Sequence, residues 1–70
     1  SEDFKRYAYR YGLKPEDRRR KFREGGHEYT LIGCKPKSHQ YPLLCERKSN
    51  GKTYKMPADS VRRALAEAGK

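Results

Sequence analysis

The chain has 70 residues, of which 33% are hydrophobic, and its mean hydropathy is −1.32. Chains of this length bury only about 60% of the surface that the unfolded state exposes, so we expect one small domain with a thin core. Eighteen Lys and Arg residues stand against nine Asp and Glu residues, which gives a formal net charge of +9. A thin core disfavours an enzyme with a deep, dry pocket, and the charge favours a polyanionic partner.

The positive charge indicates nucleic acid first and an anionic membrane surface second. A basic surface that serves only solubility is the plain alternative. No apolar run approaches the ~18 residues that a membrane span needs, and the N-terminus shows no signal-peptide pattern, so we expect a cytoplasmic protein with no membrane partner. Ser1 stands in place of an initiator Met, so an excised fragment of a longer protein is an open alternative.

Residues 2–12 are predicted to form a short amphipathic helix. One helical face carries residues at i, i+3, i+4 and i+7, namely Phe4, Tyr7, Ala8 and Tyr11. Gly12 is the expected left-handed stop, and Leu13 is expected to fold back onto the last turn.

Residues 13–26 are predicted to be a basic turn that leads into a first strand. Pro15 suits the first position of a single helical turn. A dense basic run follows, consisting of Arg18, Arg19, Arg20, Lys21 and Arg23. Phe22 interrupts this run and is predicted to enter the core as the start of the strand. The alternative for the run is a solvated linker face.

Residues 27–56 predict an antiparallel β-meander, because three short runs rich in aromatic and branched residues alternate with turn residues. Asn50 and Gly51 both tolerate positive φ and predict a tight two-residue hairpin. Gly33 is expected to mark a bend, and Pro42 places the following strand at an edge or after a bulge. Neither face of the first meander strand is clearly polar, which predicts a strongly bent sheet covered on both sides.

Residues 57–68 are predicted to form the C-terminal helix, with Pro57 at its first position and Gly69 at its end. Its apolar stripe consists of Val61, Ala64, Leu65 and Ala68. We therefore predict a single α+β domain: a small, strongly bent antiparallel meander or SH3-like barrel of three to five strands, flanked by a short helix at each end.

Metal and catalytic chemistry are disfavoured by spacing. His27, Cys34, His39 and Cys45 are farther apart in sequence than the two to four residues typical of zinc ligand pairs, so we expect no metal and no cofactor. A disulfide between the two cysteines is conceivable on adjacent strands, but a reduced pair that fills core space is favoured. A cysteine on a strand also has no electropositive helix end to lower its pKa, and the carboxylates are scattered. We expect no enzyme activity.

Three basic groups are the candidate phosphate ligands, and Tyr41 and His39 are the candidate rings that stack on bases. The groups comprise the run Arg18, Arg19, Arg20, Lys21 and Arg23, then Lys35 and Lys37 in the first meander loop, then Lys48, Lys52 and Lys55 around the hairpin. Because the loops of a bent sheet cluster at rims, two groups are expected to share a rim. About four to six phosphate contacts predict a slope of log affinity against log salt of about −4 to −5. No recognition-helix pattern supports sequence specificity, and the choice between DNA and RNA stays open.

A spaced pattern of turn and aromatic residues carries a resemblance to a known group of proteins. The pattern is Gly26-x-x-Tyr29-x-Leu31-x-Gly33-x-x-Pro36, then Tyr41-Pro42, then Asn50-Gly51-Lys52-x-Tyr54-Lys55, then Val61-Arg62. Over residues 22–66 the chain resembles short basic proteins encoded by bacteriophages and prophages, and its layout is similar to small SH3-like β-barrels. The resemblance implies a barrel module that binds nucleic acid or protein, without an assigned activity. A helix at each end departs from common barrel modules and leaves the closure of the barrel open.

We expect a non-enzymatic module that binds DNA or RNA mainly through phosphates. The alternative is a protein-interaction module, either a phage factor or a domain of a larger assembly, that binds through an edge strand starting at Tyr41 and through exposed tyrosines. Salt dependence separates the two hypotheses. Replacing Arg18, Arg19 and Arg20 together by Ala is expected to weaken phosphate binding and to leave an apolar contact almost unchanged.

Overall fold

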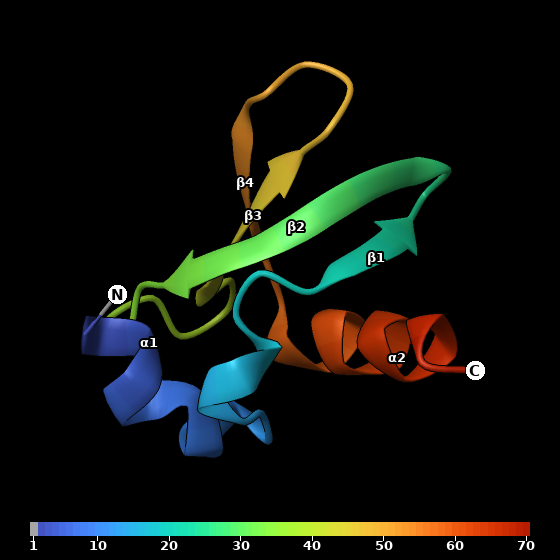
Figure 1. Cartoon of the computed structure of the whole chain (residues 1–70). Helices are drawn as coiled ribbons and strands as arrows, with labels where there is room; N and C mark the ends of the chain where they lie inside the picture. The colour runs from blue at the N-terminus through green and yellow to red at the C-terminus, as the bar shows by residue number, and fades with distance from the viewer. Residues whose placement is uncertain (1) are drawn as a thin grey trace.

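The computed structural model describes residues 2–70 as a helical layer packed against one antiparallel sheet (Figure 1). Ser1 lies outside the described residues, and so does the prediction, based on this residue, that the chain is an excised fragment. In chain order the elements are α1 (Glu2–Tyr7), η1 (Ala8–Tyr11), η2 (Pro15–Asp17), β1 (Lys21–Glu24), β2 (His27–Cys34), β3 (Leu43–Arg47), β4 (Thr53–Met56) and α2 (Ala58–Ala68). The predicted α+β class is confirmed, with four strands and a short helix at each end.

The four strands pair in chain order, β1-β2-β3-β4, and each is antiparallel to its neighbours. Because β1 and β4 are the edges of an open sheet, the sheet is not closed into a barrel. The strand that follows Tyr41 and Pro42 is β3, an interior strand. The prediction of an edge strand starting at Tyr41 is therefore wrong, and any strand added to this sheet has to pair with β1 or β4.

One face of the sheet, the inner face, is buried or half-buried except at the β1–β2 turn, where Glu24 and His27 are exposed. It carries Phe22, Tyr29, Leu31, Cys34, Leu43, Cys45, Tyr54 and Met56. The opposite side, the outer face, is exposed or half-buried and carries Lys21, Arg23, Glu28, Thr30, Leu44, Glu46, Thr53 and Lys55. Within residues 2–70 only the inner face is covered, so the prediction of cover on both faces is wrong.

A β-bulge explains why the sequence of β2 suggested two covered faces. The pairing of β2 with β3 shifts register between Leu31 and Gly33, next to the predicted bend. A bulge inserts one unpaired residue, so side chains beyond it change sides. Cys34 therefore pairs with Leu43 and is buried like Leu31, although simple alternation would place Cys34 and Leu31 on opposite faces.

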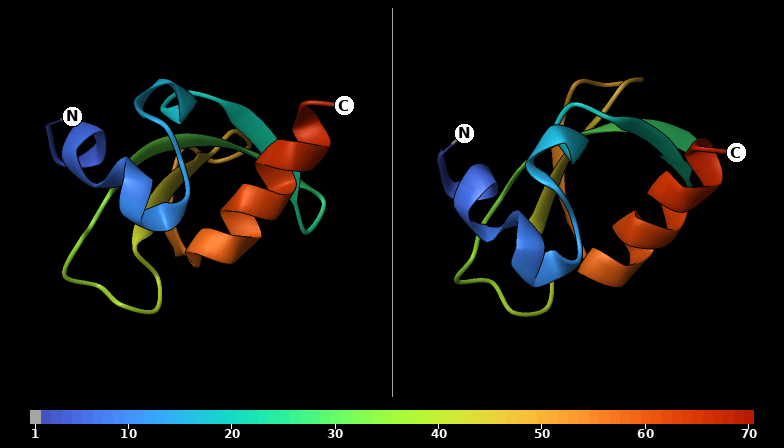
Figure 2. Two further views of the ribbon diagram at one scale, coloured as in Figure 1. Left: turned by 90° about the horizontal axis from the view of Figure 1, so that it is seen from below. Right: turned by 60° about the horizontal axis from the view of Figure 1, so that its bottom comes forward.

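Both helical segments lie on the same side of the curved sheet (Figure 2). The N-terminal segment contributes Phe4, Ala8, Tyr11 and Leu13 to the core, and α2 contributes Val61, Ala64 and Leu65. Ala68, the last residue of the predicted stripe, is exposed. Within residues 2–70 no helix is long and apolar enough to cross a membrane.

The end of the N-terminal helical segment follows its sequence signal. Gly12 has a φ of 72° and closes η1, and the Leu13 N–H donates to the Ala8 carbonyl at 3.0 Å. The predicted left-handed stop and the return of Leu13 to the core are both confirmed. Arg62 of α2 donates to the Tyr11 carbonyl at 2.7 Å, and an added Cβ at Gly12 would lie 2.9 Å from its Cδ. The glycine thus also allows α2 to approach this turn.

The tight two-residue hairpin forms at Gly25 and Gly26 instead of at Asn50 and Gly51. The two glycines have φ angles of 58° and 83° and connect β1 directly to β2. Residues 48–52 separate β3 from β4, so the prediction of a two-residue turn there is wrong. The Asn50 side chain accepts from the Lys52 N–H at 2.9 Å and donates to the Tyr54 hydroxyl at 3.0 Å, which holds a wider turn.

Substitution of Gly26 by Ala is expected to lower the free energy of unfolding by about 1–2 kcal/mol, because a Cβ disfavours left-handed backbone. No atom lies within 4 Å of the added Cβ, so the loss comes from the backbone and not from a clash. Urea unfolding measures the change. The matched control is Gly69→Ala, where φ is −82° and the nearest atoms are 3.6 Å away, and it should stay within about 0.5 kcal/mol of the parent. Equal losses in both variants would contradict the assigned turn.

Candidate nucleic-acid interface

The side chains of the predicted basic run fall into two groups, those that bond other elements of the fold and those that are exposed. Arg20 donates to Asp17 at 3.2 Å and to the carbonyl of Leu65, near the C-terminal end of α2, at 3.0 Å. Arg18 donates from Nε to the Ile32 carbonyl at 3.1 Å. Both arginines are half-buried, so replacing Arg18, Arg19 and Arg20 together would remove bonds that join the segment before β1 to η2, β2 and α2. A loss of binding in that triple variant would not separate binding from folding.

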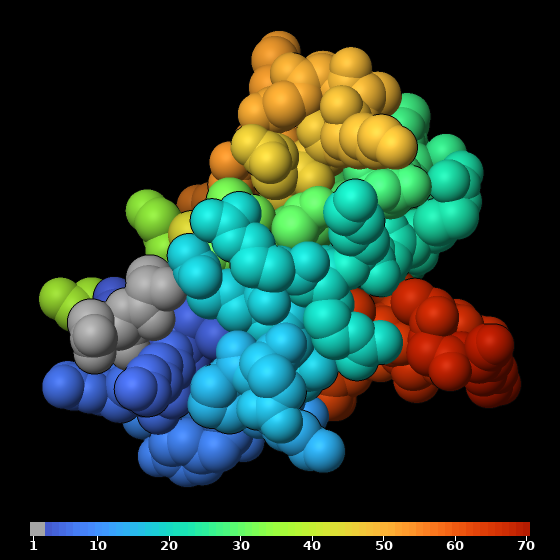
Figure 3. Space-filling model, viewed as in Figure 1, coloured from blue at the N-terminus to red at the C-terminus, as the bar shows by residue number. Residues whose placement is uncertain are grey.

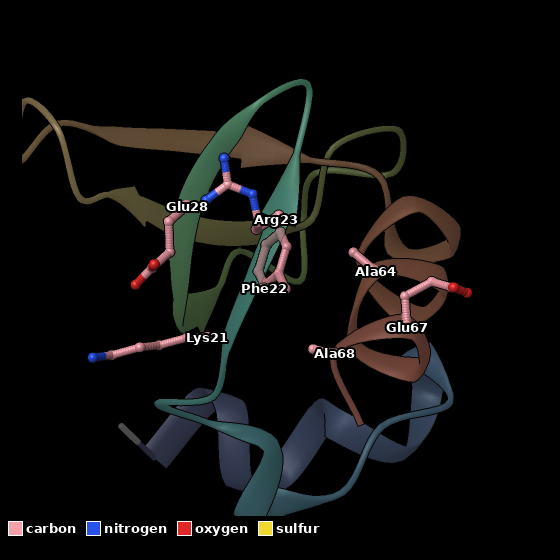
Figure 4. Close-up of a pocket in the computed structure, with 7 residues that line it drawn as sticks. All are labelled: Lys21, Phe22, Arg23, Glu28, Ala64, Glu67 and Ala68. Carbon is pink, nitrogen blue, oxygen red and sulfur yellow. The ribbon is translucent and has the colours of Figure 1, made fainter. Parts of the chain in front are cut away.

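The other cations of the run are exposed, and Arg23 also donates to the Gly26 carbonyl in the adjoining turn at 3.0 Å. Lys21 and Arg23 alternate with the buried Phe22, so they extend from the outer face while the ring enters the core. Figure 4 shows this division: Phe22 points toward Ala64 of α2, whereas the Lys21 side chain extends away from the helix. Between β1 and α2 lies an open groove of about 330 Å³ with Phe22 and Ala64 in its lining.

Lys55 extends the basic surface to the other edge strand. It lies opposite Leu44 in the β3–β4 ladder, on the same face as Lys21 and Arg23. Glu28 and Glu46 are the carboxylates of this face. In Figure 3 the cyan and teal segment that includes β1 occupies the centre of the view, and no helix lies over it.

Two of the three basic groups share a rim of the sheet, as predicted. The Lys48 N–H donates to the Glu28 carbonyl at 2.9 Å, which places the start of the 48–52 tip beside β2. Arg23 and Lys48 line one open groove of about 450 Å³, together with Gly26, His27, Glu28 and Ser49. Lys48 also approaches the Glu28 carboxylate at 4.0 Å, and its side chain is 72% exposed, so this contact holds it weakly.

Arg47 positions the tip, and sequence reasoning missed this residue. Its guanidinium donates to the Tyr29 hydroxyl at 2.7 and 3.1 Å and lies 4.3 Å from the centre of the Tyr54 ring. Tyr29 is buried in the core and Tyr54 is half-buried against it. The sequence feature that could have identified Arg47 is its place at the end of β3, two positions after the buried Cys45 and so on the same face of the strand. The guanidinium of Arg47 is therefore occupied by contacts within the domain.

The remaining predicted residues lie in the 35–42 loop, at the opposite end of β3 from the tip. Lys35 and Lys37 are exposed and line a groove with Leu44 of the outer face. His39 lines a different groove with Arg10 and Arg62, and Tyr41 is 46% exposed. The two candidate stacking rings are therefore not on the outer face of the sheet.

Neither cysteine is activated as a nucleophile. Cys34 and Cys45 are free and buried, so the predicted reduced pair that fills core space is confirmed. Burial raises the pKa of Cys45 to about 12, and burial followed by the nearby Asp3 charge raises the pKa of Cys34. Burial also raises the pKa of Tyr11, whose hydroxyl is buried without a hydrogen-bond partner among residues 2–70. These groups stay neutral at physiological pH.

The fold defines a small α+β domain with one helix-covered and one open sheet face. The family comparison is more specific: residues 1–70 match the model of the Y4mA C-terminal domain, so the chain belongs to that family. It is 33% identical over 63 residues to the "Uncharacterized protein y4mA" of Sinorhizobium fredii, in an alignment that covers 90% of this chain and 45% of that protein. The chain thus spans less than half the length of this relative. No solved structure matches the chain.

The raised pKa of Cys45 predicts a loss of stability in alkali. The unfolded thiol releases its proton near pH 9.0 and the folded thiol only near 12, so this contribution is complete below pH 9.0 and is lost as pH rises toward 12. Between about pH 8 and about pH 10.5 we expect the parent to lose about 2 kcal/mol more unfolding free energy than Cys45→Ala. Urea unfolding at both pH values measures this. The comparison uses the pH dependence of each protein, so the intrinsic effect of the substitution cancels, and equal losses would contradict the assignment.

Proposed function

We propose that this domain binds double-stranded nucleic acid through the phosphates, using the outer face of its sheet. The observation that carries the proposal is the one-sided cover of the sheet, which leaves Lys21, Arg23 and Lys55 exposed on one surface. Lys48 and Lys52 are exposed at the tip, and Lys48 shares a groove with Arg23 of this surface. Clustered cations on one face are the electrostatic footprint of nucleic-acid binding.

Unpaired charge supports a polyanionic partner. Among residues 2–70 the ion pairs are Arg20 with Asp17, Lys48 with Glu28, and Lys70 with Glu67. The chain has 18 Lys and Arg residues, so most of its cations can bind a phosphate without first breaking an ion pair with a carboxylate. Release of condensed counterions from the nucleic acid then drives association.

The composition of the outer face favours duplex over single-stranded nucleic acid. Single strands bind by stacking their bases on exposed aromatic rings. The outer face as defined above carries no aromatic side chain, and the exposed rings of Tyr9 and Tyr41 belong to η1 and to the 35–42 loop. Cations without stacking rings suit a partner whose bases are already paired and whose phosphates face outward.

The phage or prophage resemblance, the cytoplasmic location and the absence of enzyme activity stay predictions. A protein partner is the alternative outcome of the binding test. The structure restricts strand addition by such a partner to β1 or β4, and both edge strands have four residues. Proteins use short, charged edge strands to avoid strand addition, so these edges disfavour a protein partner that binds by adding a strand.

Replacement of Lys21, Arg23 and Lys55 together by Gln is expected to weaken duplex binding at about 0.1 M salt by about 100-fold or more. The slope of log affinity against log salt should become shallower by about 2 to 3, because three phosphate contacts are lost. Fluorescence anisotropy with labelled duplex DNA, duplex RNA and single strands, each over a salt series, measures both quantities.

The matched control removes three exposed charges from the helical segments, Lys5→Gln, Arg6→Gln and Arg63→Gln. Both variants lose the same share of the formal net charge of +9. The control slope should change by less than about 1. Equal weakening would show that net charge and not the outer face governs binding, and tighter binding of single strands than of duplex would overturn the duplex assignment.

A further inference from the structure

Arg19 has an unusual backbone conformation. Among residues 2–70 it is the non-glycine residue with positive φ, at 81°. The left-handed region costs a residue with a Cβ about 1–2 kcal/mol, and glycine avoids this cost. Strained residues persist where the surrounding structure enforces them, and they concentrate at binding sites.

The surrounding bonds show why the backbone needs this conformation. The Arg19 N–H donates to the Leu31 carbonyl at 2.7 Å, and the Leu31 N–H donates to the Arg20 carbonyl at 3.0 Å. Two residues on the β1 side thus face one residue of β2, which is a β-bulge just before the strand begins. In the bulge type whose first residue is left-handed, that residue is normally Gly. The backbone conformation at position 19 favours glycine, but the residue there is arginine.

No hydrogen bond or ion pair of the Arg19 side chain within residues 2–70 offsets the cost of this backbone conformation. Its neighbours Arg18 and Arg20 donate to Ile32, Asp17 and Leu65. The Arg19 side chain is exposed, and within residues 2–70 its guanidinium has no hydrogen bond or ion pair. Folding therefore does not explain why an arginine occupies this position.

We propose that Arg19 is a phosphate-binding residue of the outer-face site, retained at a cost in stability. Lys21 and Arg23 lie two positions apart on the extended strand β1, so their Cα atoms are about 7 Å apart, and the exposed Arg19 lies at the bulge just before this strand. Successive phosphates of one nucleic-acid strand have a comparable spacing, so Lys21 and Arg23 match consecutive phosphates. The bulge places Arg19 at the entry to β1, next to these two cations in the chain. This inference rests on the proposed function and adds one residue to the proposed site.

The test uses Arg19→Gly, Arg19→Lys and the charge-matched control Arg63→Gln in the complete chain. Arg19→Gly is expected to raise the melting temperature by about 4 °C through relief of strain. The same variant should bind labelled duplex about tenfold more weakly at about 0.1 M salt, with a salt slope shallower by about 1. Arg19→Lys keeps the charge and should bind within about threefold of the parent, without the gain in melting temperature. Arg63→Gln should bind within about threefold of the parent.

The outcomes distinguish this inference from the proposed function. If the parent binds duplex with a steep salt dependence and Arg19→Gly binds equally well, the role of Arg19 is wrong and the outer face remains. If Arg19→Gly does not raise the melting temperature, arginine has no cost at this position and the inference fails as well. If the parent does not bind duplex, both proposals fail. A more stable Arg19→Gly that binds more weakly supports the inference, because a purely structural role predicts no loss of binding.

Discussion

The domain contains enough apolar surface to cover one face of its sheet, and this constraint determines the rest of the structure. The core residues come from one face of β1–β4 and from two helical segments on that same side. No further element remains in residues 2–70 to cover the other face. The bulge between Leu31 and Gly33 keeps the inner face continuous, because it returns Cys34 to the buried side. An open, charged outer face is the consequence.

The same constraint gives the arginines different roles. A thin core leaves backbone carbonyls near the surface, and Arg18, Arg20 and Arg62 satisfy three of them across element boundaries. Arginine suits this role because its fork of donors reaches a carbonyl while its stem packs on apolar surface. Formal charge therefore overstates the number of cations that are free to bind a ligand. Lysines on the outer face and tip, and Arg19 at the bulge, are better candidates than the density of the run alone suggests.

Local patterns predicted the elements, whereas contacts distant in sequence decided the details. The helical period, the stop at Gly12 and the entry of Phe22 into the core could be read from neighbouring residues. The different roles of Arg20, which is bonded within the domain, and Lys21, which is exposed, could not be read in this way, because one partner of Arg20 is Leu65, 45 residues away. The turn type at Asn50 was equally hidden, because its amide binds Tyr54 across the hairpin. For the candidate site, sequence identified the basic groups but not which of them share a face.

If Arg19 binds phosphate as proposed, stability and binding are opposed at the entry to β1. A glycine at position 19 would satisfy the bulge at no steric cost, whereas an arginine there adds strain to a domain whose core is already thin. A domain with so little stability to spare tolerates such a residue only if the strain is offset elsewhere, and the bonds of Arg18 and Arg20 on either side supply that offset. The run is thus one unit in which two arginines fix the backbone and the arginine between them is held exposed. The dense charge of this run and its unusual backbone then have a single physical explanation.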